Sequence, residues 1–217
     1  MEPIWLEWFA LAGLLAFATW LLGLQGVWQL LLTSDHTGIT LVIIIIFTGG
    51  TCWCGKRARE LSRQRRAFTR LTTDPTLRPE DPSWVEEYLI NLHHASRDPT
   101  APIDLLLERT HGTHTTAWWV NGIQLKLGLL GKVIGFSILA LEIGEIQNFD
   151  PAQTQDLLKR LTSGLGIALL TTMVGLIGNI LLGLQLTRLD RFADEIVSRA
   201  QAHGIELGYV AASQRGT

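Results

Sequence analysis

The sequence predicts an all-α integral membrane protein with four transmembrane helices and a small helical cytoplasmic portion. Of its 217 residues, 47% are hydrophobic, and these gather into charge-free runs at residues 8–34, 37–55 and 161–187. A hydrocarbon core about 30 Å thick needs roughly 20 apolar residues in a helix. Three spans therefore follow directly from the sequence.

A fourth span is expected over residues 118–146, although Lys126, Lys132 and Glu142 interrupt it. The alternative has three spans, with the first run lying along the membrane surface. Residues 8–32 are apolar nearly all round, whereas a helix at the interface needs a strongly polar face. This favours four spans.

The first run is expected to be one retained helix, because no basic residue precedes it as in a signal peptide. Residues 33–38 (TSDHTG) then form a tight turn, and residues 39–55 return as the second span. The basic residues that follow are Lys56, Arg57, Arg59, Arg63, Arg65, Arg66, Arg70 and Arg78. The positive-inside rule places them in the cytoplasm, which explains them better than nucleic-acid binding does.

The cytoplasmic portion is expected to be helical and too small for a catalytic domain. The basic helix continues to about residue 71, three prolines break residues 72–82, and Ser83 with Glu86 forms a capping box that opens a helix to about residue 96. A short helix follows at residues 103–109. Trp118 and Trp119 mark re-entry into the membrane. Residues 148–163 form an outer link, and Gly204 is expected to end the last helix.

This organisation divides the chain into four parts. Residues 1–55 form an N-terminal transmembrane hairpin, 56–117 a cytoplasmic helical segment, 118–187 a pair of channel-forming helices, and 188–217 a cytoplasmic helix and tail. The histidines of the second part, which include His111 and His114, are interpreted as surface or loop residues. No spacing in the chain predicts a metal site or a cofactor site.

The third and fourth spans carry small residues at helical spacing. Gly128, Gly131 and Gly135 are expected to share one face with Lys132. The fourth span has a similar stripe, made of Ala168, Thr171 or Thr172, Gly175, and Gly178 or Asn179. Because membrane helices associate through close packing of small residues, these glycines and Ala168 are predicted to pack the two helices together.

Lys132 lies about midway along the third span, where a charge costs roughly 2.5 to 3.5 kcal/mol on insertion scales. No carboxylate of the chain lies at matching depth, since Glu142 is about 15 Å further along the same helix. Lys132 therefore predicts a water-filled pore or an acidic partner in another chain.

Two segments resemble the paired signatures of the MotA/TolQ/ExbB family of bacterial stator and proton-channel proteins: GLLGKVIG at residues 128–135 and ALLTTMVGL at residues 168–176. The resemblance implies a pentamer in the bacterial inner membrane around two copies of a single-span protein of the ExbD, TolR or MotB type, whose membrane aspartate takes up protons. It places Thr172 on the family's pore-facing threonine. Lys132 stands where relatives usually have threonine, and Ile167 where ExbB and TolQ have glutamate.

The predicted function is therefore a ring-forming motor or channel subunit of an ion-driven, energy-transducing complex, with Lys132, Thr171 and Thr172 on the pore or ion pathway. It is not an enzyme, because no nucleophile triad, phosphate loop or Rossmann fingerprint is present. A non-conducting membrane scaffold is the alternative. A small-solute transporter is a third possibility, for which neither broken helices nor inverted repeats are evident.

Overall fold

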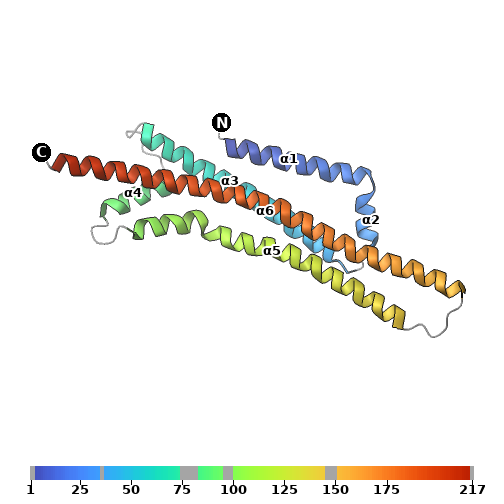
Figure 1. Ribbon diagram of the computed structural model, residues 1–217. Helices are drawn as coiled ribbons and strands as arrows, with labels where there is room; N and C mark the ends of the chain where they lie inside the picture. The colour runs from blue at the N-terminus through green and yellow to red at the C-terminus, as the bar shows by residue number, and fades with distance from the viewer. Residues whose placement is uncertain (1–2, 35–36, 74–82, 95–99, 145–150, 216–217) are drawn as a thin grey trace. The chain divides into compact units, whose positions relative to one another are not determined.

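The computed structural model describes residues 3–34, 37–73, 83–94, 100–144 and 151–215, and all the regular structure in these residues is α-helical (Figure 1). The predicted all-α fold is confirmed. The helices are α1 (Pro3–Leu24), α2 (Val27–Ser34), α3 (Ile39–Thr73), α4 (Trp84–His94), α5 (Ala101–Gly144) and α6 (Pro151–Arg215).

Three described helices, α3, α5 and α6, are long and apolar enough to cross a membrane. The chain is thus a multi-pass membrane protein by helix length and composition. The apolar stretch of α1 is shorter and covers Trp8–Leu24. The expectation of one helix over residues 8–34 is wrong, because the chain turns at Gly26, whose φ of 74° favours glycine. A similar turn at Gly38, with φ of 72°, precedes α3.

The long helices are more continuous than the sequence predicted. α3 carries the basic segment without a break, as expected, but α5 also runs unbroken through residues 110–117. α6 begins within the expected outer link and continues past Gly204 to Arg215. Gly204 does not end the helix because it is buried against α4, where a Cβ would lie 2.9 Å from Leu92. Packing of this kind outweighs a single glycine's weak helix propensity.

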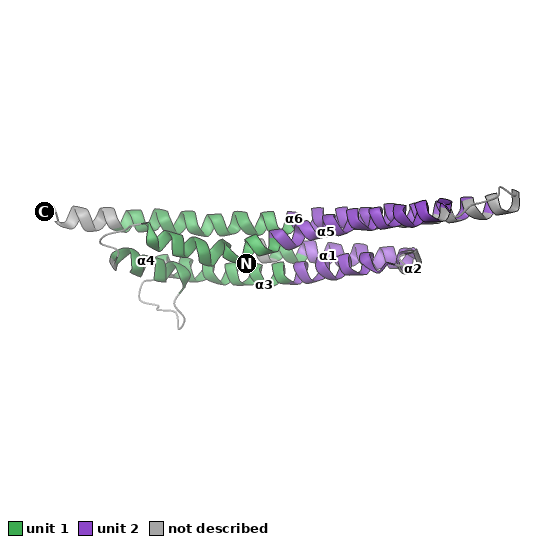
Figure 2. Cartoon of the chain, turned by 90° about the horizontal axis from the view of Figure 1, so that it is seen from below, with its two compact units in different colours: residues 1–9, 53–117, 185–217 green, residues 10–52, 118–184 purple. Residues whose placement is uncertain are grey.

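The helices contribute to two compact units, coloured separately in Figure 2. Unit 1 comprises residues 1–9, 53–117 and 185–217, and unit 2 comprises residues 10–52 and 118–184. The core of unit 1 includes Leu61 of α3, Leu106 of α5 and Phe192 of α6. Ile43, Ala168 and Leu182 are buried in unit 2. Charged residues are concentrated in unit 1, whereas the long charge-free runs lie mainly in unit 2.

The predicted cap of α4 is present at Ser83. The Glu86 backbone N–H donates to Ser83 Oγ at 3.1 Å, and the Trp84 backbone N–H donates to Gln64 Oε1 of α3 at 3.0 Å. Ser83 is buried. Its hydroxyl thus satisfies a donor that water cannot easily reach.

Replacing Ser83 by alanine is expected to lower the free energy of unfolding by about 1 kcal/mol, because the Glu86 N–H loses its acceptor. Chemical unfolding of the purified protein in detergent would measure the change. Ser198→Ala on the exposed surface of α6 is the control. Equal stability of the two variants would contradict a capping role for Ser83.

Candidate functional site

The close contact between α5 and α6 in unit 2 is built from small residues. The three glycines of α5, Gly128, Gly131 and Gly135, are all buried. A Cβ on Gly128 would lie 3.3 Å from the Thr171 carbonyl oxygen, one on Gly131 would overlap the Thr171 side chain, and one on Gly135 would lie 2.8 Å from Ala168 Cβ. The two backbones can therefore approach closely only because side chains are absent here.

The α6 side of this contact is equally tight. A Cβ on Gly175 would lie 2.8 Å from the Gln124 carbonyl oxygen and 3.0 Å from Gly128 Cα, which are backbone atoms that cannot rotate away. A Cβ on Gly178 would lie 2.5 Å from Gln124 Oε1. All six residues predicted for helix packing lie along this contact.

The two threonines predicted on the ion pathway occupy different environments. Thr171 is 1% exposed and packs against Gly131, inside the contact. Thr172 is half-buried, and its Oγ lies 2.9 Å from the Ala168 carbonyl oxygen and 3.1 Å from the Gly128 carbonyl oxygen. Its single O–H proton can therefore link α6 to α5.

A buried group of amides extends the same contact, and the sequence analysis missed most of it. Asn121 and Gln124 of α5 are 3% and 0% exposed. Gln124 Nε2 donates to Asn121 Oδ1 at 3.2 Å, and Asn179 Nδ2 donates to the Asn121 carbonyl at 2.9 Å. Positions 121, 124, 128, 131 and 135 are spaced by three and four, so extending the glycine stripe backwards would have found these residues.

Lys132 lies at the edge of this contact. By spacing it flanks the glycine face, four residues after Gly128 and three before Gly135, but its side chain is exposed whereas the three glycines are buried. It is turned about 40° from Gly128, about 60° from Gly135 and about 100° from Gly131 around the helix, which places it at the edge of the contact. Its Nζ lies 5.9 Å from the centre of the Phe136 ring, and no described carboxylate forms an ion pair with it. The side chains of Glu142 and Ile167 lie outside the described part of the structure.

Comparison with models of known protein families finds none that matches this chain, and comparison with curated protein sequences finds no significant match.

A second polar cluster joins α5 to α6 in unit 1. His114 Nδ1 lies 2.6 Å from Asp190 Oδ1, and His111 Nε2 lies 3.0 Å from Asp194 Oδ1. His114 is 2% exposed, so its interpretation as a surface or loop residue is wrong, and His111 is half-buried within the same helix. Each pair joins residues at least 76 positions apart, which no local pattern reveals.

This cluster is also held from α3. Arg57 donates from Nη2 to the carbonyls of Arg109 and Thr110, at 2.6 Å and 3.1 Å, and the Trp53 ring meets the His114 ring edge-on at 5.9 Å between centres. Among the described residues, no group of three or more His, Cys, Asp or Glu side chains could hold a metal. The cluster connects three helices through pairwise polar contacts.

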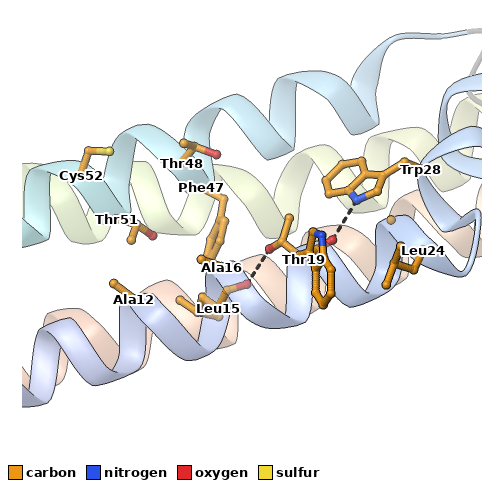
Figure 3. Close-up of a pocket in the computed structure, with 12 residues that line it drawn as sticks. Ala12, Leu15, Ala16, Thr19, Leu24, Trp28, Phe47, Thr48, Thr51 and Cys52 are labelled. Atoms are coloured by element: carbon orange, nitrogen blue, oxygen red, sulfur yellow. Dashed lines mark hydrogen bonds between the residues drawn. The ribbon is translucent and has the colours of Figure 1, made fainter.

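An apolar groove of about 660 Å³ lies between α1 and α3 in unit 2 (Figure 3). Small residues of α1, including Ala12, Ala16 and Thr19, line one side, and Phe47 and Thr51 of α3 line the other. Trp28 of α2 folds over one end and donates from Nε1 to the Thr19 carbonyl at 3.1 Å. The groove offers few polar groups, so its chemistry favours an apolar occupant.

Proposed function

We propose that this chain is the ring-forming subunit of an ion-driven, energy-transducing complex in a bacterial inner membrane, with Lys132 at the surface where the subunit meets its partner. The observation that carries the proposal is the exposure of Lys132 beside the closely packed glycine stripe of α5. The resemblance of residues 128–135 and 168–176 to the MotA/TolQ/ExbB signatures supports the same reading.

The depth of Lys132 makes lipid an unsuitable neighbour. It stands twelve residues before Gly144 and fourteen after Trp118, or about 18 and 21 Å at 1.5 Å per residue. A four-carbon stem does not easily reach either interface from there. Nearby residues of α5, such as Leu129 and Val133, are exposed and apolar. A protonated lysine in this position calls for a carboxylate or water supplied by another chain.

The proposed assembly is a homopentamer around two copies of a single-span protein with a membrane aspartate. At an effective dielectric constant of about 20, charges roughly 5 Å apart interact by about 3 kcal/mol. A contact between Lys132 and such an aspartate would therefore strongly favour the charged carboxylate. Proton uptake would require this contact to break as the two components move.

Replacing Lys132 by threonine is expected to change proton flux by more than tenfold, because the partner carboxylate loses a fixed positive neighbour. Flux would be measured in membrane vesicles that hold the full chain together with a single-span protein that carries a membrane aspartate. Lys126→Thr is the matched control, since Lys126 is also exposed but lies six residues nearer the start of the span.

Two results would contradict the proposal: a wild-type protein that is monomeric in lipid, or unchanged flux in a Lys132→Thr variant that still assembles. A non-conducting scaffold is the second candidate, and Lys132 itself favours it, because a fixed cation in a pore opposes the passage of protons and metal ions. Absence of flux from a correctly assembled wild-type ring would select the scaffold.

A further inference from the structure

The cytoplasmic half of α3 carries a straight stripe of exposed basic residues. Its members are Lys56, Arg59, Arg63, Arg66 and Arg70, spaced by three and four residues, and all five are exposed. This spacing keeps them on one side of the helix. The stripe is about 21 Å long, because its ends are fourteen residues apart.

The other two arginines of this segment point into unit 1. Arg57 donates to carbonyls of α5, and Arg65 stacks over Phe192 and pairs with Glu195 of α6. The single carboxylate of α3, Glu60, accepts a hydrogen bond from Gln64. The exposed side of the helix therefore accumulates like charges, which repel one another at these spacings. An anionic surface outside the chain would offset this repulsion.

The bilayer surface accounts for little of the stripe. The headgroup region is roughly 6 Å thick on each side, given about 30 Å of hydrocarbon and 40–45 Å in all. A helix that leaves the membrane steeply carries its later residues beyond this layer. Arg63 stands seven residues after Lys56, about 10 Å further along the axis. Lipid headgroups are therefore out of reach of Arg63, and a further contact with an anion, in addition to the interaction it makes within its own chain, would come from a surface deeper in the cytoplasm.

Exposed carboxylates occur on α5 at matching heights. The contacts Trp53 to His114 and Arg57 to Arg109 show that α3 and α5 run antiparallel in unit 1, with position 57 level with 109–110. Counting along both helices places Arg59 level with Glu108, and Arg63 level with Asp104. Both carboxylates are exposed, and neither forms an ion pair within the described residues.

We infer that the basic stripe of α3 docks on the Asp104 and Glu108 side of α5 in a second copy of this chain. Rotation about an axis along the membrane normal preserves height, so residues that are level within one subunit are also level between neighbours in a ring. Arg63 then meets Asp104, and Arg59 meets Glu108. A guanidinium has five donors, so arginines that interact within their own chain, as Arg59 and Arg63 do, can bind a neighbour's carboxylate as well. The inference rests on the proposed ring.

Charge reversal in the full chain tests this pairing. Arg63→Glu is expected to weaken each subunit contact about fivefold or more, since an exposed ion pair contributes up to about that factor and the variant replaces it with repulsion. The double variant Arg63→Glu with Asp104→Arg should restore the ring. Arg66→Glu is the matched control, because position 66 is level with Thr100 and Ala101, which carry no charge. Native mass spectrometry from lipid nanodiscs would count the subunits.

A second measurement does not depend on weakening the assembly. In an Arg63→Lys variant, a carbodiimide should join the new amine to Asp104 of a neighbouring chain and give a covalent dimer, which is lost when Asp104→Asn is added. If the wild type forms a ring but the Arg63→Lys variant gives no such cross-link, or if Arg63→Glu weakens the ring no more than Arg66→Glu does, the pairing is overturned and the ring still stands. A monomeric wild-type protein would overturn the ring itself.

Discussion

Gly175→Ala is expected to lower the free energy of unfolding by about 1–3 kcal/mol, the usual cost of overpacking a well-packed contact. The added Cβ would lie 2.8 Å from the Gln124 carbonyl oxygen and 3.0 Å from Gly128 Cα. Both are backbone atoms, so α5 and α6 must move apart to admit it. This separation also lengthens the bond from Thr172 to the Gly128 carbonyl, now 3.1 Å.

Gly122→Ala is the control, because it makes the same chemical change on α5 where no atom lies within 4 Å of the new Cβ. Alanine is the better helix former, so this variant should be as stable as wild type or slightly more stable. Denaturant titration in detergent micelles, followed by tryptophan fluorescence, would compare them. A Gly175→Ala protein as stable as Gly122→Ala would show that the helices do not depend on their close approach.

Asp190→Ala is expected to cost about 1–3 kcal/mol, because it removes a partner from a buried histidine. The Nδ1 atom of His114 lies 2.6 Å from Asp190 Oδ1, and its Nε2 has no hydrogen-bond partner among the described residues. The variant therefore leaves both ring nitrogens of His114 without a protein partner there. The contact between α5 and α6 in unit 1 should weaken.

Asp194→Ala provides the comparison one helical turn away. Asp194 pairs with His111, but its side chain is 71% exposed, so water replaces the lost contact and the expected cost is below about 1 kcal/mol. Thermal unfolding of the two purified variants would measure the difference. Equal destabilisation would show that burial of His114 does not decide the strength of the Asp190 pair.

Much of the fold is predictable because membrane insertion depends on long apolar stretches, which are visible in sequence. The runs that contain residues 39–55 and 161–187 lie in helices long and apolar enough to span. The N-cap at Ser83 was equally local, and its bond from the Glu86 N–H to Ser83 Oγ is confirmed. Two glycines were misinterpreted. Gly204 was expected to end a helix and does not, whereas Gly26 was expected to lie within a helix, but the chain turns there with a positive φ.

The candidate site was harder to predict because its contacts join distant parts of the chain. The small residues of α5 and α6 follow helical periodicity, so their faces could be derived. Whether His114 faces Asp190 depends on how the antiparallel helices α5 and α6 are aligned along their axes. A shift of one turn would change every residue pair between them. Lys132 shows the opposite case, since its charge marked it in the sequence but its exposure required the structure.

The division into units has a consequence for how this protein is made. Unit 1 draws on residues 53–117 and 185–217, and Leu189, Phe192 and Ile196 of its final segment are buried. A ribosome releases this segment after the other pieces of unit 1. The earlier pieces of unit 1 therefore keep their apolar faces uncovered until α6 has inserted into the membrane and residues 185–217 have been synthesised. If translation paused or stopped after residue 184, the basic end of α3 would lack the buried residues of α6 that complete the core of unit 1.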